Sequence, residues 1–124
     1  MMDHFGISVA DLDASARFYD TVLGTLGHTR LMDFGQAIGY GTGAEAGFWI
    51  SGPVEGASNR ECHIAFSAPD VAAVDAWFAA AEALGAEVLH RPRLWPEYHE
   101  HYYGAFVRDP DGNNVEAVCH TAEA

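Results

Sequence analysis

The chain contains no lysine, and this shortage of cationic residues restricts its possible partners. The net charge of −12 results from eighteen Asp and Glu residues against six arginines. Such a chain repels phosphate backbones, so we expect no nucleic-acid partner. The acidic residues are spread along the whole sequence. This distribution is typical of a solubilising surface and would also attract a cationic ligand.

Cysteines and long hydrophobic runs are equally scarce. Cys62 and Cys119 are too far apart for a zinc knuckle or a Cys-x-x-Cys redox pair, so we expect free thiols in a reducing cytoplasm. No apolar run is long enough to span a membrane, and the first residues do not resemble a secretion signal. The sequence therefore predicts a cytoplasmic protein without a membrane segment. Its 124 residues suit a single domain over 1–124.

An internal repeat is the most informative feature that is present. Residues 4–19 and 63–78 align at an offset of 59 positions, which pairs His4 with His63 and Asp11 with Asp70. A repeat of this length in so short a chain indicates two copies of one structural module.

The first copy reads as a strand followed by an amphipathic helix. Residues 4–9 alternate between apolar and small polar side chains, which is the pattern of a strand with one covered face. Asp11 is placed to cap a helix that Gly24 would end. Glycines then divide residues 28–52 into short apolar stretches that we interpret as three strands.

The second copy has the same plan. A strand from His63 to Ser67 precedes a helix that Asp70 caps and Gly85 ends. Three further strands are expected, over residues 86–90, 102–108 and 114–119. The last two flank Asp-Pro-Asp-Gly-Asn, whose proline and glycine favour a tight turn. The polar, proline-containing residues 91–101 are predicted to form a mobile loop.

The sequence thus predicts an α+β fold of two pseudo-symmetric βαβββ modules, residues 1–52 and 62–124, joined by a linker over 53–61. Each helix should cover the apolar face of its own sheet. The small polar faces of the two sheets would then form an open, barrel-like trough with the helices outside.

Strand alternation suggests a metal site in this trough. His4 and His63 fall on the small polar faces of their strands, and Glu116 falls opposite the apolar face of the last strand. Two imidazoles and one carboxylate on one side of a cavity suit a divalent cation such as Fe, Mn, Ni or Zn, with coordination positions left open. Lone inward-facing histidines are usually structural, but a symmetric pair with a carboxylate favours metal binding.

These residues belong to motifs that resemble the vicinal oxygen chelate superfamily, which includes glyoxalase I, extradiol dioxygenases, fosfomycin-resistance thiol transferases and bleomycin-binding proteins. The motifs are Asp-His with Val-Ala-Asp-Leu and Phe-Tyr-x-x-Val-Leu-Gly near the start, then His-Ile-Ala-Phe, then Phe-Val-Arg-Asp-Pro-Asp-Gly-Asn-Asn-Val-Glu. The resemblance implies His4, His63 and Glu116 as metal ligands. It also implies a small-molecule substrate and a homodimer.

The sequence departs from glyoxalase I at one position. That enzyme takes a further carboxylate ligand, which serves as the proton-transfer base, from the last strand of its first module. In this sequence that strand is expected over residues 47–51, and the pseudo-symmetric partner of Glu116 falls near Trp49. The resemblance therefore favours a three-ligand site, and Trp49 would form an aromatic wall of the substrate pocket.

Other candidate site residues lie in or beside the predicted loop over residues 91–101, which precedes the strand over 102–108. His101, Tyr102 and Tyr103 are candidates for an acid–base group, and alternation does not choose between the two tyrosines. Arg93 and Tyr98 are candidates for the substrate pocket, although exposed arginines are more often solubilising.

Three functions remain open at the level of sequence. The leading hypothesis is a metal-dependent dioxygenase or lyase that chelates two neighbouring oxygens of a small substrate at His4, His63 and Glu116. The alternative is a drug-binding protein of the bleomycin-resistance kind. Its acidic and aromatic residues would suit a flat cationic ligand. A thiol transferase is the weakest hypothesis because few cations are available for an anion pocket.

Overall fold

A computed structural model describes residues 2–52 and 61–123 and divides the chain into two units, Met1–Arg60 and Glu61–Ala124. Each unit contains one four-stranded mixed sheet and one helix, in the order strand, helix, strand, strand, strand. This confirms the predicted α+β class and the two βαβββ modules. The predicted linker, except for Glu61, lies outside the described residues. The assignment of one domain to the whole chain stays a prediction.

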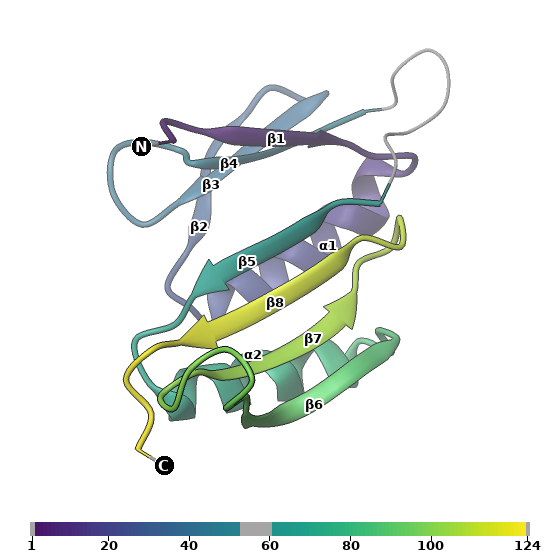
Figure 1. The fold of residues 1–124 in the computed structure, drawn as a ribbon. Helices are drawn as coiled ribbons and strands as arrows, with labels where there is room; N and C mark the ends of the chain where they lie inside the picture. The colour runs from purple at the N-terminus through teal and green to yellow at the C-terminus, as the bar shows by residue number, and fades with distance from the viewer. Residues whose placement is uncertain (1, 53–60, 124) are drawn as a thin grey trace. The chain divides into compact units, whose positions relative to one another are not determined.

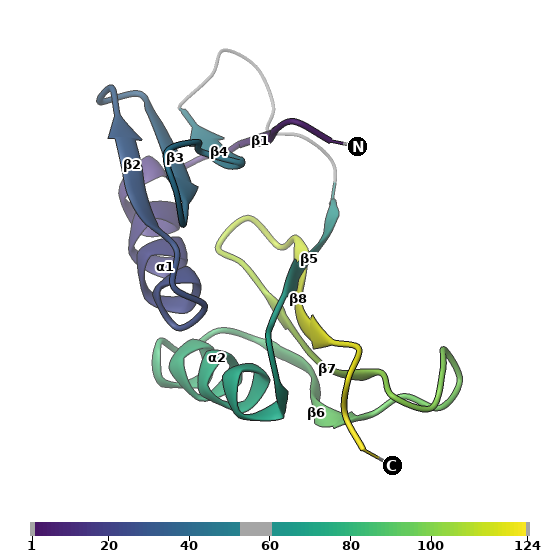
Figure 2. The same cartoon turned by 90° about the vertical axis from the view of Figure 1, so that its left-hand side faces the viewer.

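The sheet of unit 1 has its first and last strands side by side. Its elements are β1 (Phe5–Ser8), α1 (Leu12–Gly24), β2 (Thr29–Asp33), β3 (Ala37–Gly41) and β4 (Phe48–Ser51). The strand order is β1-β4-β3-β2, in which β1 and β4 are parallel and the other neighbours are antiparallel. Helix α1 packs on β2 and β4, and Figures 1 and 2 show it along one face of this sheet.

Helix α1 begins as the sequence predicts but ends differently. The Asp11 side chain accepts a hydrogen bond from the Ala14 amide at 3.1 Å, which satisfies one of the free amides of the first turn. The predicted stop, Gly24, is instead the last helical residue, and Thr25 is the cap. The chain reverses at Gly27, whose φ of 83° lies in the left-handed region. Gly24 and Gly27 lie close together here, and Gly27 is the one that takes the positive φ.

A polar network ties α1 to the sheet of unit 1. The buried Tyr40 hydroxyl donates to Asp20 Oδ1 at 2.8 Å, and the Arg30 guanidinium donates to both oxygens of Asp20 at 2.8 and 2.7 Å. Burial alone would raise the pKa of Asp20, but the hydrogen bonds from Arg30 and Tyr40 outweigh it and lower the pKa. The network therefore favours the ionised carboxylate, and folding gains from it.

We predict that Asp20→Asn destabilises unit 1 at neutral pH and that the difference from wild type narrows in acid. The folded-state pKa of Asp20 lies below its ordinary value of 3.8, so its contribution is present above that pH and is lost as the pH falls through the folded pKa. Urea denaturation between pH 7 and pH 3 measures the effect. A difference that stays constant over this range would contradict the prediction. Asp13→Asn, an exposed change on the same helix, is the control.

Unit 2 repeats the topology of unit 1. Its elements are β5 (His63–Ser67), α2 (Val71–Ala83), β6 (Val88–Leu94), β7 (Tyr103–Arg108) and β8 (Asn114–Cys119). The strand order is β5-β8-β7-β6, in which β5 and β8 are parallel. Helix α2 packs on β6, β7 and β8 and lies along one face of the sheet in Figure 1.

Both ends of helix α2 lie where the sequence predicts them. The Asp70 side chain accepts from the Ala73 amide at 2.8 Å, and Gly85, with a φ of 83°, follows the C-terminal cap. Trp77 is fully buried on the face that contacts the sheet. Helix and sheet therefore share one apolar core within the unit.

The prediction of a loop over residues 91–101 is wrong for residues 91–94, which belong to a strand. Strand β6 continues to Leu94 and so includes Pro92. This is possible because β6 is the edge strand and its pairing with β7 is irregular between His90 and Arg93, where no ladder hydrogen bond is required of Pro92. The rest forms a turn closed by a hydrogen bond from the Trp95 amide to the Tyr102 carbonyl at 2.8 Å.

Among the residues that the structure describes, neither helix has the length and hydrophobicity that crossing a bilayer would require.

Candidate metal centre

The pairing of β7 and β8 determines which side of the second sheet carries Glu116. Tyr103 is opposite Cys119 and bonds to Asp75 of α2, so this register position faces the helix. Glu116, three positions before Cys119, therefore lies on the other face, as strand alternation predicts. There its Cα is paired with Ala65 of β5 on one side and with Phe106 of β7 on the other.

His63 and Glu116 lie in direct contact on that face. His63 Nε2 is 3.0 Å from Glu116 Oε1, and His63 Nδ1 is 3.1 Å from the Asn114 carbonyl oxygen. A carbonyl only accepts, so Nδ1 carries a proton. Nε2 then donates to the carboxylate when the ring is protonated and presents a lone pair to it when the ring is neutral. Two acceptors at this distance require a proton or a cation between them. Atoms each about 2.1 Å from one cation are about 3 Å apart at right angles, so the pair fits two ligands of one metal ion.

Glu116 is almost fully buried, with 1% of its surface exposed. Burial raises the pKa of its carboxyl group, while the hydrogen bond from Tyr102 and the neighbouring His63 act in the opposite direction. The Tyr102 hydroxyl donates to Glu116 Oε2, and burial together with this carboxylate raises the pKa of Tyr102. One oxygen of Glu116 is thus held by Tyr102, and the other faces His63.

The backbone beside Glu116 leaves room for its carboxylate. A Cβ at Gly104 would lie 3.1 Å from Glu116 Oε2 and 3.3 Å from the Tyr102 ring. The buried Trp95 indole donates to the Gly104 carbonyl at 3.0 Å and fixes this stretch of β7. A side chain at this position would require the carboxylate or the tyrosine ring to shift by a few tenths of an ångström, whereas glycine leaves both in place.

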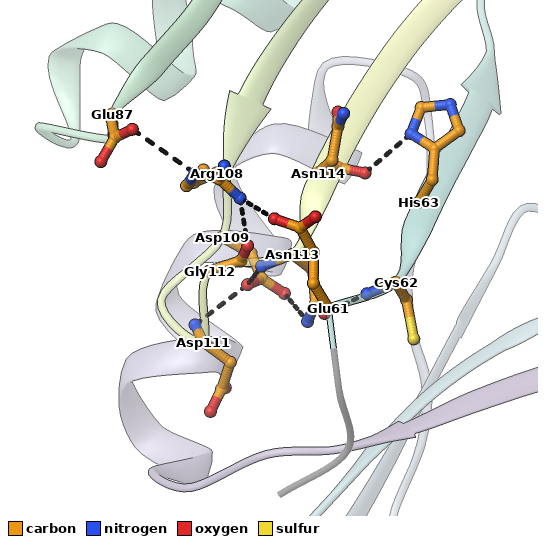
Figure 3. A network of polar contacts seen from close by, with 10 residues as sticks. All are labelled: Glu61, Cys62, His63, Glu87, Arg108, Asp109, Asp111, Gly112, Asn113 and Asn114. Carbon is orange, nitrogen blue, oxygen red and sulfur yellow. Dashed lines mark hydrogen bonds and ion pairs between the residues drawn. The ribbon is translucent and has the colours of Figure 1, made fainter.

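The turn after β7 is bonded to the residue directly before His63, at the start of β5 (Figure 3). Asp109 accepts from the Asp111 and Asn113 amides at 2.9 Å and from Asn113 Nδ2 at 2.8 Å. Asn113 Oδ1 in turn accepts from the Cys62 amide at 2.8 Å. The residues of this predicted turn thus fasten the start of β5, and His63 with it, to the start of β8.

His4 lies in unit 1, just before β1, and has a similar arrangement of its ring. His4 Nδ1 is 2.6 Å from Asp3 Oδ1, which leaves Nε2 available as a ligand. Metal-binding histidines usually donate their second ring N–H to a carboxylate or carbonyl in this way. Among the described residues, no three His, Cys, Asp or Glu side chains gather around one point. The contact that the structure assembles is therefore that of His63 with Glu116.

Trp49 occupies the position in unit 1 that Glu116 occupies in unit 2. Glu116 is paired with Ala65 of the first strand of its module, and Trp49 is paired with Gly6, the repeat counterpart of Ala65. The Trp49 indole donates to the Ala46 carbonyl at 3.3 Å. No carboxylate therefore stands at this symmetric position.

The two tyrosines left open by the sequence have different surroundings. Tyr102 contacts Glu116, whereas the Tyr103 hydroxyl donates to Asp75 of α2 at 2.7 Å, and burial with this bond raises the pKa of Tyr103 to about 12. Tyr103 therefore lies on the helix side of the sheet. His101 bonds through Nδ1 to the Ala122 carbonyl at 2.7 Å, so its ring holds the C-terminal segment.

Arg93 and Tyr98 both contact the Trp95 ring. The Arg93 guanidinium is 3.4 Å from the centre of the Trp95 ring and pairs with Glu97 at 2.9 Å. Tyr98 stacks on Trp95 at 5.7 Å between ring centres, meets Tyr102 at 4.9 Å and is 59% exposed. Tyr98 thus provides an exposed aromatic surface beside Tyr102, while Arg93 is already engaged by protein groups.

Sequence reasoning missed the residues that orient the candidate ligands. Asp3 was available as a signal, because an acidic residue directly before a candidate ligand can orient its ring. The Asn114 carbonyl and the Asn113 side chain gave no comparable signal. Their role depends on the parallel pairing of β5 with β8, which joins residues 51 positions apart in the chain.

We predict that Tyr102→Phe costs more stability than Tyr103→Phe, although each removes one hydroxyl. The first change leaves an oxygen of the buried Glu116 without its donor and should cost about 1–3 kcal/mol. The second releases an exposed Asp75 to water and should cost less than about 1 kcal/mol. Urea denaturation of both variants at pH 7 measures the difference, and equal losses would refute it.

Comparisons with known proteins agree with this architecture. A sequence profile of the Glyoxalase/Bleomycin resistance protein/Dioxygenase superfamily matches residues 1–117. No curated protein matches the chain.

Solved structures resemble the chain over nearly its whole length. A glyoxalase/bleomycin resistance protein from Albidiferax ferrireducens T118 is 31% identical with a TM-score of 0.81, over 94% of this chain and 96% of its own. A lactoylglutathione lyase from Agrobacterium tumefaciens is 29% identical with a TM-score of 0.68, over 95% and 92%. The fosfomycin resistance protein FosX from Mesorhizobium loti, 20% identical with a TM-score of 0.70 over 98% and 92%, shares the fold.

Proposed function

Because the chain belongs to the Glyoxalase/Bleomycin resistance protein/Dioxygenase superfamily, we propose that it is a metal-dependent enzyme acting on a small, oxygen-rich substrate. The observation that carries this proposal is the contact between His63 Nε2 and Glu116 Oε1 at 3.0 Å. A buried carboxylate that faces an imidazole lone pair is costly unless a cation or proton lies between them. The donor set therefore fits a divalent metal ion.

The ligands would be His4, His63 and Glu116. In the two histidines, Nδ1 is held by Asp3 and by the Asn114 carbonyl respectively, so both rings present Nε2. That His4 joins the other two is part of the proposal and rests on the repeat and the family resemblance. Fe, Mn, Ni and Zn all accept two imidazoles and one carboxylate, and the donor set does not select among them.

When bound, a divalent ion would supply Lewis acidity that holds two neighbouring substrate oxygens and stabilises the negative charge that develops on them. The protein's own part is to keep the ligands in place. Tyr102 holds the second oxygen of Glu116, and Gly104 leaves space for both groups. Tyr102 is also the candidate for moving a proton, through its hydroxyl oxygen, at the face where Glu116 lies.

The symmetric position favours chemistry without a second protein carboxylate. Trp49 stands in unit 1 where Glu116 stands in unit 2. Trp49 cannot abstract a proton, so a lyase mechanism that relies on a carboxylate base at this position is disfavoured. We therefore favour an open three-ligand centre of the dioxygenase kind over glyoxalase I chemistry. A cytoplasmic homodimer is the assembly that we propose with it.

Metal binding is the direct test of this function. We expect protein purified without a tag or chelator to bind close to one equivalent of Mn²⁺, Ni²⁺, Zn²⁺ or Fe²⁺ per chain after equilibration, as measured by elemental analysis. His63→Ala and Glu116→Gln should each weaken binding at least tenfold, because each removes a ligand. His4→Ala should weaken it similarly if unit 1 completes the site.

His28→Ala is the matched control, since His28 lies after α1 and is not a proposed ligand. Circular dichroism of each variant verifies folding. Equal metal content in wild type and His63→Ala would refute the proposed centre. Loss of metal in His63→Ala but not in His4→Ala would instead restrict the site to unit 2.

A further inference from the structure

Two histidines of unit 2 that are not proposed metal ligands lie directly against each other. His99 lies in the turn between β6 and β7, and His120 follows β8. His99 Nε2 is 2.9 Å from His120 Nδ1. The ring centres are 5.2 Å apart and the ring planes differ by 25°, so the rings meet edge to edge, as an N–H···N hydrogen bond requires.

The backbone determines where the proton of this bond lies. The His101 amide donates to His99 Nδ1 at 3.1 Å, so that nitrogen carries a lone pair. The proton of the neutral His99 ring is therefore on Nε2, which donates to a lone pair on His120 Nδ1. The same amide disfavours a metal ion between the rings, since a neutral imidazole that binds metal through Nε2 carries its proton on Nδ1. The arrangement therefore requires two neutral imidazoles.

A further proton breaks this arrangement, whichever ring receives it. On His99 the proton would occupy Nδ1 and oppose the His101 amide, and on His120 it would oppose the Nε2–H of His99. The carboxylates of Glu100 and Glu116 would attract the added charge. Their attraction affects the pH at which the pair is protonated but supplies no replacement for the lost bond. Imidazoles ordinarily take up this proton between about pH 8 and pH 5.

The imidazole pair is one of three attachments between the turn and the C-terminal segment, residues 120–123. The Ala122 amide donates to the His101 carbonyl at 3.2 Å, and His101 Nδ1 donates to the Ala122 carbonyl at 2.7 Å. The bond from His101 Nδ1 survives protonation, because an imidazolium keeps its Nδ1–H. Acid therefore removes the attachment through the pair and leaves the one through His101.

Both rings of the pair pack edge-on against Tyr102. The ring centres of His99 and His120 are 5.4 and 5.2 Å from that of Tyr102, with ring planes at 73° and 90°. Tyr98 contacts Tyr102 as well, at 4.9 Å. Because the Tyr102 hydroxyl donates to Glu116, the pair supports the residue that holds this buried carboxylate.

We propose that His99 and His120 are positioning residues that hold Tyr102 in place against Glu116 while both imidazoles are neutral, and that protonation of either ring loosens Tyr102 and the C-terminal segment. This switch lies within unit 2 and needs no metal ion. Only its consequence for catalysis rests on the proposed function, in which Tyr102 holds one oxygen of Glu116.

NMR on metal-free protein tests the arrangement and its pH dependence. At pH 8, proton–nitrogen spectra of the imidazoles should show His99 and His120 protonated on Nε2 and His101 protonated on Nδ1. As the pH falls to 5, the protection factor of the Ala122 amide should fall at least threefold and the Tyr102 ring resonances should shift, both together with protonation of the pair. A proton on Nδ1 of His99 or His120 at pH 8, or an Ala122 amide whose protection does not change with pH, would overturn the proposal.

Three variants locate the switch, with circular dichroism to verify folding. His120→Phe keeps a ring beside Tyr102 but cannot accept from His99, so protection of the Ala122 amide should be low at pH 8 and change little down to pH 5. His120→Asn supplies an acceptor that does not titrate and should restore the protection at pH 8. His101→Asn is the matched control, since it removes a neighbouring histidine and leaves the pair, so the Tyr102 resonances should still shift. An Ala122 response in His120→Phe equal to that of wild type, or no shift of Tyr102 in His101→Asn, would count against the pair.

The proposed switch and the proposed enzyme function fail separately. Metal uptake that depends on His63, without a pH response of the Ala122 amide, would remove the switch and leave the metal centre. A pH response in a chain that takes up no metal would leave the switch and remove the enzyme function.

Discussion

The structure depends on the parallel pairing of the first and last strands of each module. This pairing places residue 6 beside residue 49 in one unit and residue 65 beside residue 116 in the other. The first-strand residue of each pair, Gly6 or Ala65, is small, so the larger neighbour on the last strand can project from the sheet without crowding. Long-range pairing of this kind also fixes His63, because its ring bonds to the backbone of β8 rather than to its own strand.

Burial of Glu116 is the main cost of the candidate site, and the surrounding residues reduce it. A carboxylate removed from water loses several kcal/mol of hydration unless donors or cations replace it. Tyr102 supplies one donor, and His63 approaches the other oxygen. The absence of a side chain at Gly104 leaves space for the carboxylate, which a Cβ there would approach to 3.1 Å. Such an arrangement is hard to explain by stability alone, since an apolar residue in a strand between β5 and β7 would be less costly. The proposed metal ion would replace the lost hydration at the oxygen that faces His63.

Much of this could be read from the sequence, because the relevant signals are local. Asp11 and Asp70 identified the helix starts through their caps, and the alternation of β8 identified the face of Glu116. The errors arise where the deciding interaction is not local. Gly24 and Gly27 both lie near the end of α1, and the choice between them depends on how the chain re-enters the sheet. Pro92 appeared to exclude a strand because nothing in the sequence marks β6 as an edge.

Tyr102 illustrates the same limit at the site. Alternation could not choose between Tyr102 and Tyr103, since a shift of one residue at the start of a strand exchanges its two faces. The structure separates them through their partners, Glu116 on one face and Asp75 on the other. Trp49 and Glu116 extend this argument to the repeat as a whole. One scaffold position carries an indole in one module and a carboxylate in the other. The repeat thus preserves a position in the fold, while the residue at that position determines whether it offers an oxygen ligand to a metal ion.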